Sequence, residues 1–97
     1  EPLREQLRSG RLENLRAIAD RYGAVGDHDN VLATHHKILE IDPCDESAYG
    51  ALMRLYHTQG RIGRVSDTWC HYKQAAETLG VSENPELEAL YLRFTRS

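Results

Sequence analysis

The feature that most constrains this fold is a proline that lies between two helical patterns with almost no linker. Apolar residues at helical spacing cover 31–41 and again 48–56. Pro43 cannot continue the first helix, because it lacks the backbone N–H and its ring clashes with the preceding turn, so we expect that helix to end near Asp42. Asp45 is a candidate N-cap, since its carboxylate can accept from the free N–H groups of the next turn. The sequence therefore predicts two consecutive helices joined by a tight reversal.

Glycines and one Asn-Pro pair divide the rest of the chain. Gly26, Gly60 and Gly80 follow apolar helical stripes and are suited to helix ends. Asn84 and Pro85 supply an N-cap and a first helical residue for a last helix. The sequence thus predicts an all-α chain of five helices in antiparallel succession. Its 97 residues suffice for one small core, so we expect a single domain over residues 1–97.

The first four of these helices contain an internal repeat. Seven residues recur 34 positions later in one register: Leu15, Ile18, Ala19, Tyr22, Gly26, Val31 and His35 match Tyr49, Leu52, Met53, Tyr56, Gly60, Val65 and Trp69. A helix–turn–helix period of this length, closed by a proline, resembles the tetratricopeptide repeat (TPR). The resemblance implies two TPR-like units plus a C-terminal helix, a right-handed α-solenoid fragment. Glu77 stands where the second closing proline is expected, so the fourth helix should continue to about Leu79.

Three segments resemble a bacterial regulatory family more closely. They are DPCDESAYGALM at 42–53, the pair Tyr72-Lys73, and ETLGVSENPELEALY at 77–91. Together they are similar to the bacterial transcriptional activator domain of SARP-type regulators, whose last segment carries an LGVEPSPEL-like signature where this chain has LGVSENPEL. The resemblance spans essentially the whole chain.

This resemblance implies a regulatory module that follows a winged-helix DNA-binding domain. Its expected partners are proteins, through self-association or a linked regulatory domain, and DNA only through that upstream domain. The chain begins at Glu1 without a methionine, so we expect an N-terminally trimmed piece. The alternative is a free-standing TPR-type peptide-binding adaptor. A winged helix encoded immediately upstream would favour the first interpretation, and further 34-residue units would favour the second.

Composition excludes several classes of function. The net charge of −3 arises from mixed signs throughout, so no single-sign field attracts DNA or an anionic membrane. Apolar runs are too short for a membrane span or a signal peptide. Cys44 and Cys70 have no CxxC or CxxH spacing, which indicates reduced thiols and a cytoplasmic location.

The titratable residues do not form a recognisable catalytic or metal motif. Five histidines, His28, His35, His36, His57 and His71, lack the spacing of three or four that places two ligands on one helix face. Cys70 and His71 are adjacent and point in different directions on a helix, so the imidazole does not readily activate the thiol. We therefore expect no enzyme activity, no catalytic or metal residue, no cofactor and no small-molecule substrate.

Aromatic residues of the fourth helix are expected in the core. Trp69 and Tyr72 share the helical period of Val65 and Ala76, which favours packing over ligand stacking.

TPR geometry implies a concave groove lined by the first helix of each unit, at its second, fifth, ninth and twelfth positions. The corresponding residues are Glu13, Arg16, Asp20 and Gly23, then Ser47, Gly50, Arg54 and His57. Of these, the candidate partner-binding residues are Glu13, Arg16, Asp20, Ser47, Arg54 and His57. Arg16 and Arg54 can pair with acidic groups of a partner. The alternative is a solvated groove filled by the chain's own flanking segments.

Overall fold

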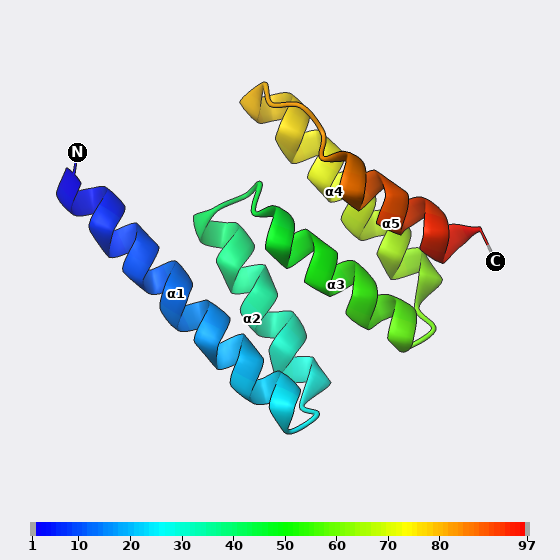
Figure 1. Ribbon diagram of the computed structural model, residues 1–97, viewed down its shortest axis with the longest axis horizontal. Coiled ribbons are helices and arrows are strands. Elements are labelled where there is room, and N and C mark those ends of the chain that lie inside the picture. The colour runs from blue at the N-terminus through cyan, green and yellow to red at the C-terminus, as the bar shows by residue number, and fades with distance from the viewer. Residues whose placement is uncertain (1, 97) are drawn as a thin grey trace. The chain divides into compact units, whose positions relative to one another are not determined.

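The structure, a computed structural model, describes residues 2–96 and the side chains of residues 9–96. It contains the helices α1 (Pro2–Ala24), α2 (His28–Ile41), α3 (Glu46–Thr58), α4 (Ile62–Leu79) and α5 (Pro85–Thr95). Figure 1 shows them in chain order, and residues 2–96 contain no strand. The prediction of an all-α chain with five helices is confirmed.

Three helices begin at the side-chain caps that local sequence favours. Asp27, Asp45 and Asn84 precede α2, α3 and α5. Their side-chain oxygens accept hydrogen bonds from the backbone N–H groups of Asn30, Ala48 and Glu86, at 3.3, 3.0 and 2.8 Å. Such a cap is typically worth about 1 kcal/mol of helix stability. The joint at Pro43 therefore ends one helix at Ile41 and starts the next at Glu46.

Three helices end in the same way, at a glycine with left-handed backbone. Gly26, Gly60 and Gly80 have φ values of 74°, 73° and 70°. The residue after each glycine donates its N–H to a carbonyl five residues earlier, which is the Schellman ending. These bonds join Asp27 to Tyr22, Arg61 to Tyr56 and Val81 to Ala76, at 2.9, 2.8 and 3.0 Å. The first two turns lie 34 residues apart, so the sequence period reappears as the same backbone turn.

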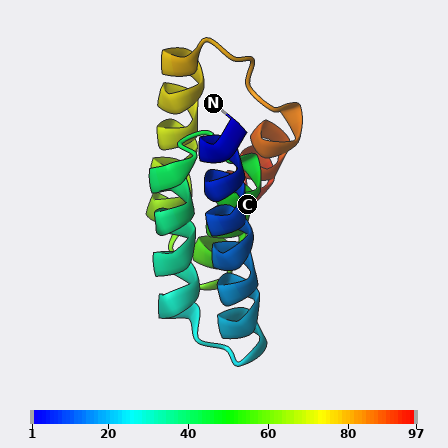
Figure 2. The same ribbon diagram turned by 90° about the vertical axis from the view of Figure 1, so that its left-hand side faces the viewer.

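Contacts divide the chain into two compact units, residues 1–42 and 43–97. In the first unit, α1 and α2 lie side by side and antiparallel (Figure 2). Leu12 and Ala19 of α1 are buried, as are Leu32, Thr34 and Ile38 of α2. The Thr34 hydroxyl donates to the carbonyl of Asn30 at 2.7 Å, which satisfies this buried polar group within its own helix.

In the second unit, α5 packs against both α3 and α4. Leu52, Met53, Val65 and Tyr72 are almost completely buried. Trp69 is 6% exposed, and its ring stacks on that of Tyr91 with centroids 5.2 Å apart. The prediction that Trp69 and Tyr72 belong to the core is confirmed.

Equivalent repeat positions differ in burial between the two units. Ile18 is 39% exposed, whereas its counterpart Leu52 is 1% exposed. Within the first unit α1 packs on one helix, while within the second α3 packs on two.

Candidate functional site

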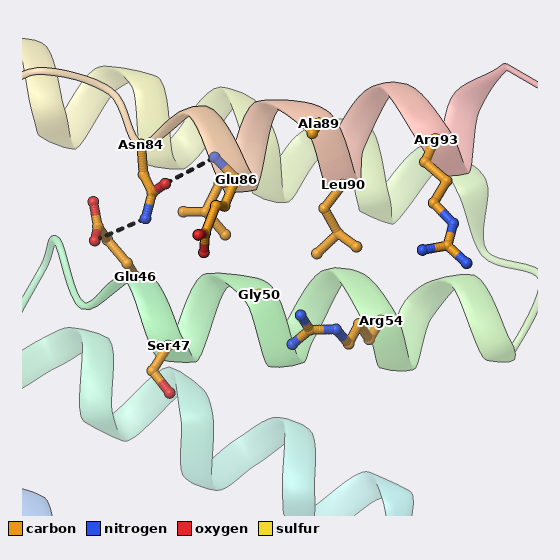
Figure 3. A pocket seen from close by; sticks show the side chains of 10 residues that line it. Glu46, Ser47, Gly50, Arg54, Asn84, Glu86, Ala89, Leu90 and Arg93 are labelled. Atoms are coloured by element: carbon orange, nitrogen blue, oxygen red, sulfur yellow. Dashed lines mark hydrogen bonds between the residues drawn. The ribbon is translucent and has the colours of Figure 1, made fainter.

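An open groove of about 420 Å³ runs between α3 and α5 of the second unit (Figure 3). The residues that line it come from one face of each helix: Glu46, Ser47, Gly50 and Arg54 from α3, and Asn84, Glu86, Leu87, Ala89, Leu90 and Arg93 from the start and length of α5. We refer to it as the α3–α5 groove.

The two ends of the α3–α5 groove carry opposite charge. The helices run in the same direction (Figure 1), so Glu46 and Glu86, each in the first turn of its helix, lie at one end. Arg93 lies toward the other end, and Figure 3 shows its side chain extending from α5 toward α3, whereas the Arg54 side chain lies along α3 and turns back toward Gly50. Acidic first turns and a basic last turn also complement the helix macrodipoles, which explains part of this pattern locally.

The acidic end is fastened by a hydrogen-bond network that joins three helices. The Glu46 carboxylate accepts from the Tyr72 hydroxyl at 3.0 Å and from the Asn84 side-chain amide at 3.0 Å. The same Tyr72 hydroxyl accepts from the backbone N–H of Asn84 at 2.6 Å. Burial raises the pKa of the Tyr72 phenol, and the Glu46 carboxylate raises that pKa further, against a lowering by the Asn84 N–H. The phenol is therefore held protonated as a donor to Glu46.

The six partner-binding residues predicted from the sequence do not all meet in this groove. Ser47 and Arg54 line it, as does the neighbouring Gly50. His57 is absent from the lining and instead stacks on Phe94 of α5, with ring centroids 4.1 Å apart and an interplanar angle of 10°. The remaining three, Glu13, Arg16 and Asp20, are exposed on α1, within the first unit.

Sequence reasoning missed the α5 wall of the groove. Its residues follow those of α3 at an offset of 39, not 34: Glu86, Ala89 and Arg93 succeed Ser47, Gly50 and Arg54. The longer α4 and the segment 80–84 account for the shift. The signal was present in the departure at Glu77, which already predicts that the helix runs past the repeat boundary.

The described side chains supply recognition groups more than reactive ones. No group of three or more His, Cys, Asp or Glu residues among them is placed to hold a metal ion. Cys44 is half-buried and Cys70 is exposed, and neither forms a disulfide within the described residues. None of the described helices is long and apolar enough to cross a membrane. The groove itself offers carboxylates, guanidinium groups and an apolar middle, a combination suited to binding charged chains.

Comparison with known proteins adds a family to this geometry. A family model described as the bacterial transcriptional activator domain (BTAD) matches residues 1–94. This chain belongs to that family. As a family, the BTAD is a non-catalytic regulatory domain of bacterial transcriptional activators. Neither the search of curated proteins nor the search of solved structures returned a match.

Proposed function

We propose that this BTAD is a protein-interaction module that sets the activity of a winged-helix DNA-binding domain in the same regulator. It does so by associating with a second copy of itself or with a linked regulatory domain, in the cytoplasm. The observation that carries this proposal is the family match over residues 1–94. The exposed charges of the α3–α5 groove support it, because charged, solvated side chains beside apolar ones are typical of transient interfaces.

We further propose that residues 1–97 act as one domain with a TPR-like repeat of two units and a C-terminal helix. The matching glycine turns, 34 residues apart, support a shared ancestry of the two helix pairs. In this proposal the partner-binding residues are Glu13, Arg16 and Asp20 of α1 together with Ser47, Arg54 and His57 of α3.

Competition in the cell tests the interaction role. We expect the 97-residue chain, expressed beside the complete regulator, to occupy the shared interface and change transcription from a reporter under that regulator's control. A matched control is the chain carrying Trp69→Ala, which loses a buried core aromatic and should be inactive as a competitor. Sedimentation of the purified chain across concentrations then shows whether the interface is with itself. An unchanged reporter at matched expression, together with a chain that stays monomeric, would refute the proposal.

Contact with DNA is assigned to the upstream domain in this proposal. The chain carries a net charge of −3. The residues that come closest to a basic patch, Arg54, Arg61 and Arg64, can neutralise only a few phosphates. Arg61 is also engaged locally, since its guanidinium lies 5.0 Å from the centre of the Tyr56 ring. We expect no saturable binding to a random duplex in fluorescence anisotropy at physiological salt. Sub-micromolar binding that disappears in Arg61→Glu/Arg64→Glu would move the DNA contact into this domain.

A further inference from the structure

The charges that line the α3–α5 groove are separated by a defined length. Glu46 and Arg54 are eight residues apart on α3, and Glu86 and Arg93 are seven apart on α5. With a rise of 1.5 Å per residue, the Cα atoms of each pair lie about 10–12 Å apart along the axis. The Arg54 guanidinium turns back toward Gly50, so the groove has an acidic pole at Glu46 and Glu86, a basic pole at Arg93, and the Arg54 guanidinium on the α3 wall between them.

Most of these charges are available to a ligand. Glu46 already accepts two hydrogen bonds within the network at the acidic pole. By contrast, within residues 9–96 the side chains of Glu86, Arg54 and Arg93 take part in no hydrogen bond or ion pair, and all three are exposed. The Arg93 guanidinium at the basic pole and the Arg54 guanidinium beside Gly50 hold no carboxylate of residues 9–96, and they favour an acidic ligand group in this half of the groove.

Between the poles the α5 wall of the groove is apolar, and the α3 wall carries Gly50 with the Arg54 guanidinium beside it. Leu87 is 6% exposed, and half-buried Leu90 points from α5 toward α3 in Figure 3. A Cβ added at Gly50 would lie 3.5 Å from Leu87 Cδ2 and 3.4 Å from Arg54 Nη1. A side chain at this position would therefore occupy the space between Leu87 and Arg54. Glycine inside a helix is less favourable than alanine. Helix dipoles alone explain neither this glycine nor Arg54, which lies well inside α3.

These features select an extended chain as the occupant. A helix with its side chains is about 10–12 Å across, wide for a groove between two helices in direct contact. An extended segment advances about 3.3–3.6 Å per residue, so three residues span the distance between the poles. We propose that the α3–α5 groove binds an extended peptide segment of a partner protein, with a basic side chain at the Glu46/Glu86 pole, an acidic side chain three residues away at the Arg93 pole, and an aliphatic side chain between them that packs on Leu87 and Leu90. This inference rests on the proposed interaction role and names the chemistry of the partner.

A capped peptide with lysine, leucine, alanine and glutamate in that order is the probe, with binding followed by NMR shifts of α3 and α5 amides. Its order-reversed counterpart is tested in parallel, because the groove fixes charge polarity and not chain direction. We expect Glu86→Gln and Arg93→Gln each to weaken binding about two- to fivefold, the range for one exposed charge pair. The matched controls, Glu88→Gln on α5 and Arg64→Gln on α4, are exposed, lie outside the groove lining and should bind as the wild type does.

Double-mutant cycles between the protein and the peptide show which peptide side chain binds at which pole of the groove. Glu86→Gln should have no effect on a peptide whose lysine is replaced by glutamine, and Arg93→Gln none on a peptide whose glutamate is so replaced. The proposal is overturned if none of these peptides binds or if the control variants lose as much affinity as the groove variants. It is also overturned if Glu86 couples to the peptide glutamate and Arg93 to the peptide lysine. Binding of free lysine with the same couplings would assign the groove to a small ligand and also overturn it.

The same variants separate this inference from the proposed function. If the chain carrying Glu86→Gln/Arg93→Gln still changes the reporter as the wild-type chain does, the groove proposal fails and the interaction role stands. If the peptide couplings are found and the wild-type chain has no effect on the reporter, the regulatory role fails and the groove assignment stands.

Discussion

The Tyr72 hydroxyl holds together the three helices of the second unit, and its removal is a specific test of the network. Tyr72→Phe deletes one oxygen and leaves the buried ring in place. The backbone N–H of Asn84 then loses its acceptor, which costs about 1–3 kcal/mol for a buried donor. Asn84 is only half-buried and Glu46 is exposed, so water replaces part of what is lost. We therefore expect a loss of about 1–2 kcal/mol in the free energy of unfolding, measured by urea denaturation with far-UV circular dichroism.

Tyr91→Phe is the matched control for this substitution. Tyr91 contacts Trp69 as Tyr72 does, is half-buried, and accepts the hydrogen bond of the Thr95 hydroxyl through its backbone carbonyl. Tyr91→Phe should lower the free energy of unfolding by less than about 0.5 kcal/mol, as do most substitutions away from buried polar contacts. Hydrogen exchange at the Asn84 amide should accelerate in Tyr72→Phe alone. Equal urea midpoints for the two variants would show that the Tyr72 hydroxyl contributes nothing to the unit.

Three further predictions concern the core, the turns and pH. Trp69→Ala should lower the free energy of unfolding by about 3–5 kcal/mol, and a midpoint in urea equal to that of the wild type would place Trp69 outside the core. Gly60→Ala should destabilise by about 1–2 kcal/mol because φ is positive there, while Gly63→Ala, in open space in the first turn of α4, should stabilise by at most about 1 kcal/mol, both measured by urea denaturation. If both glycines respond alike, the Schellman turn is not what constrains Gly60. The Tyr72 pKa is raised above 10.0 in the folded chain, so its contribution to stability is complete below about pH 10 and is lost as the pH rises through the folded value. Urea midpoints of the wild type should therefore fall more steeply above pH 10 than those of Tyr72→Phe, and parallel curves would contradict the shift.

Local chemistry made the helix boundaries predictable. Pro43 forbids one helix from continuing, and Asp45 satisfies the first N–H groups of the next, so the two residues define the joint without any distant contact. Gly80 ends α4 for an equally local reason, since its left-handed φ closes the Schellman bonds. The family resemblance was predictable as well, because its signature is a linear string at 77–91 that the family match includes.

The candidate site was only partly predictable, because half of it depends on how α5 aligns with α3. A strict 34-residue period identified Ser47 and Arg54 but gave no register for Glu86 or Arg93. The network of Glu46, Tyr72 and Asn84 joins residues 26 and 38 positions apart, and no local pattern specifies it. His57 was predicted to bind a partner from its spacing alone, and that spacing gave no indication of its stacking on the Phe94 ring of α5.

The pairing of α3 with α5 also has a consequence for the order of folding. Every other helix pair that packs within a unit is adjacent in the chain, whereas this pair is separated by all of α4. Closing the longer loop costs more entropy, so we expect the α3–α4 hairpin to form early and α5 to dock last. The groove then exists only after that final step, and it disappears whenever α5 detaches while α3 and α4 remain folded. A ligand or substitution that favours detachment of α5 would therefore prevent the proposed peptide binding while α3 and α4 remain folded.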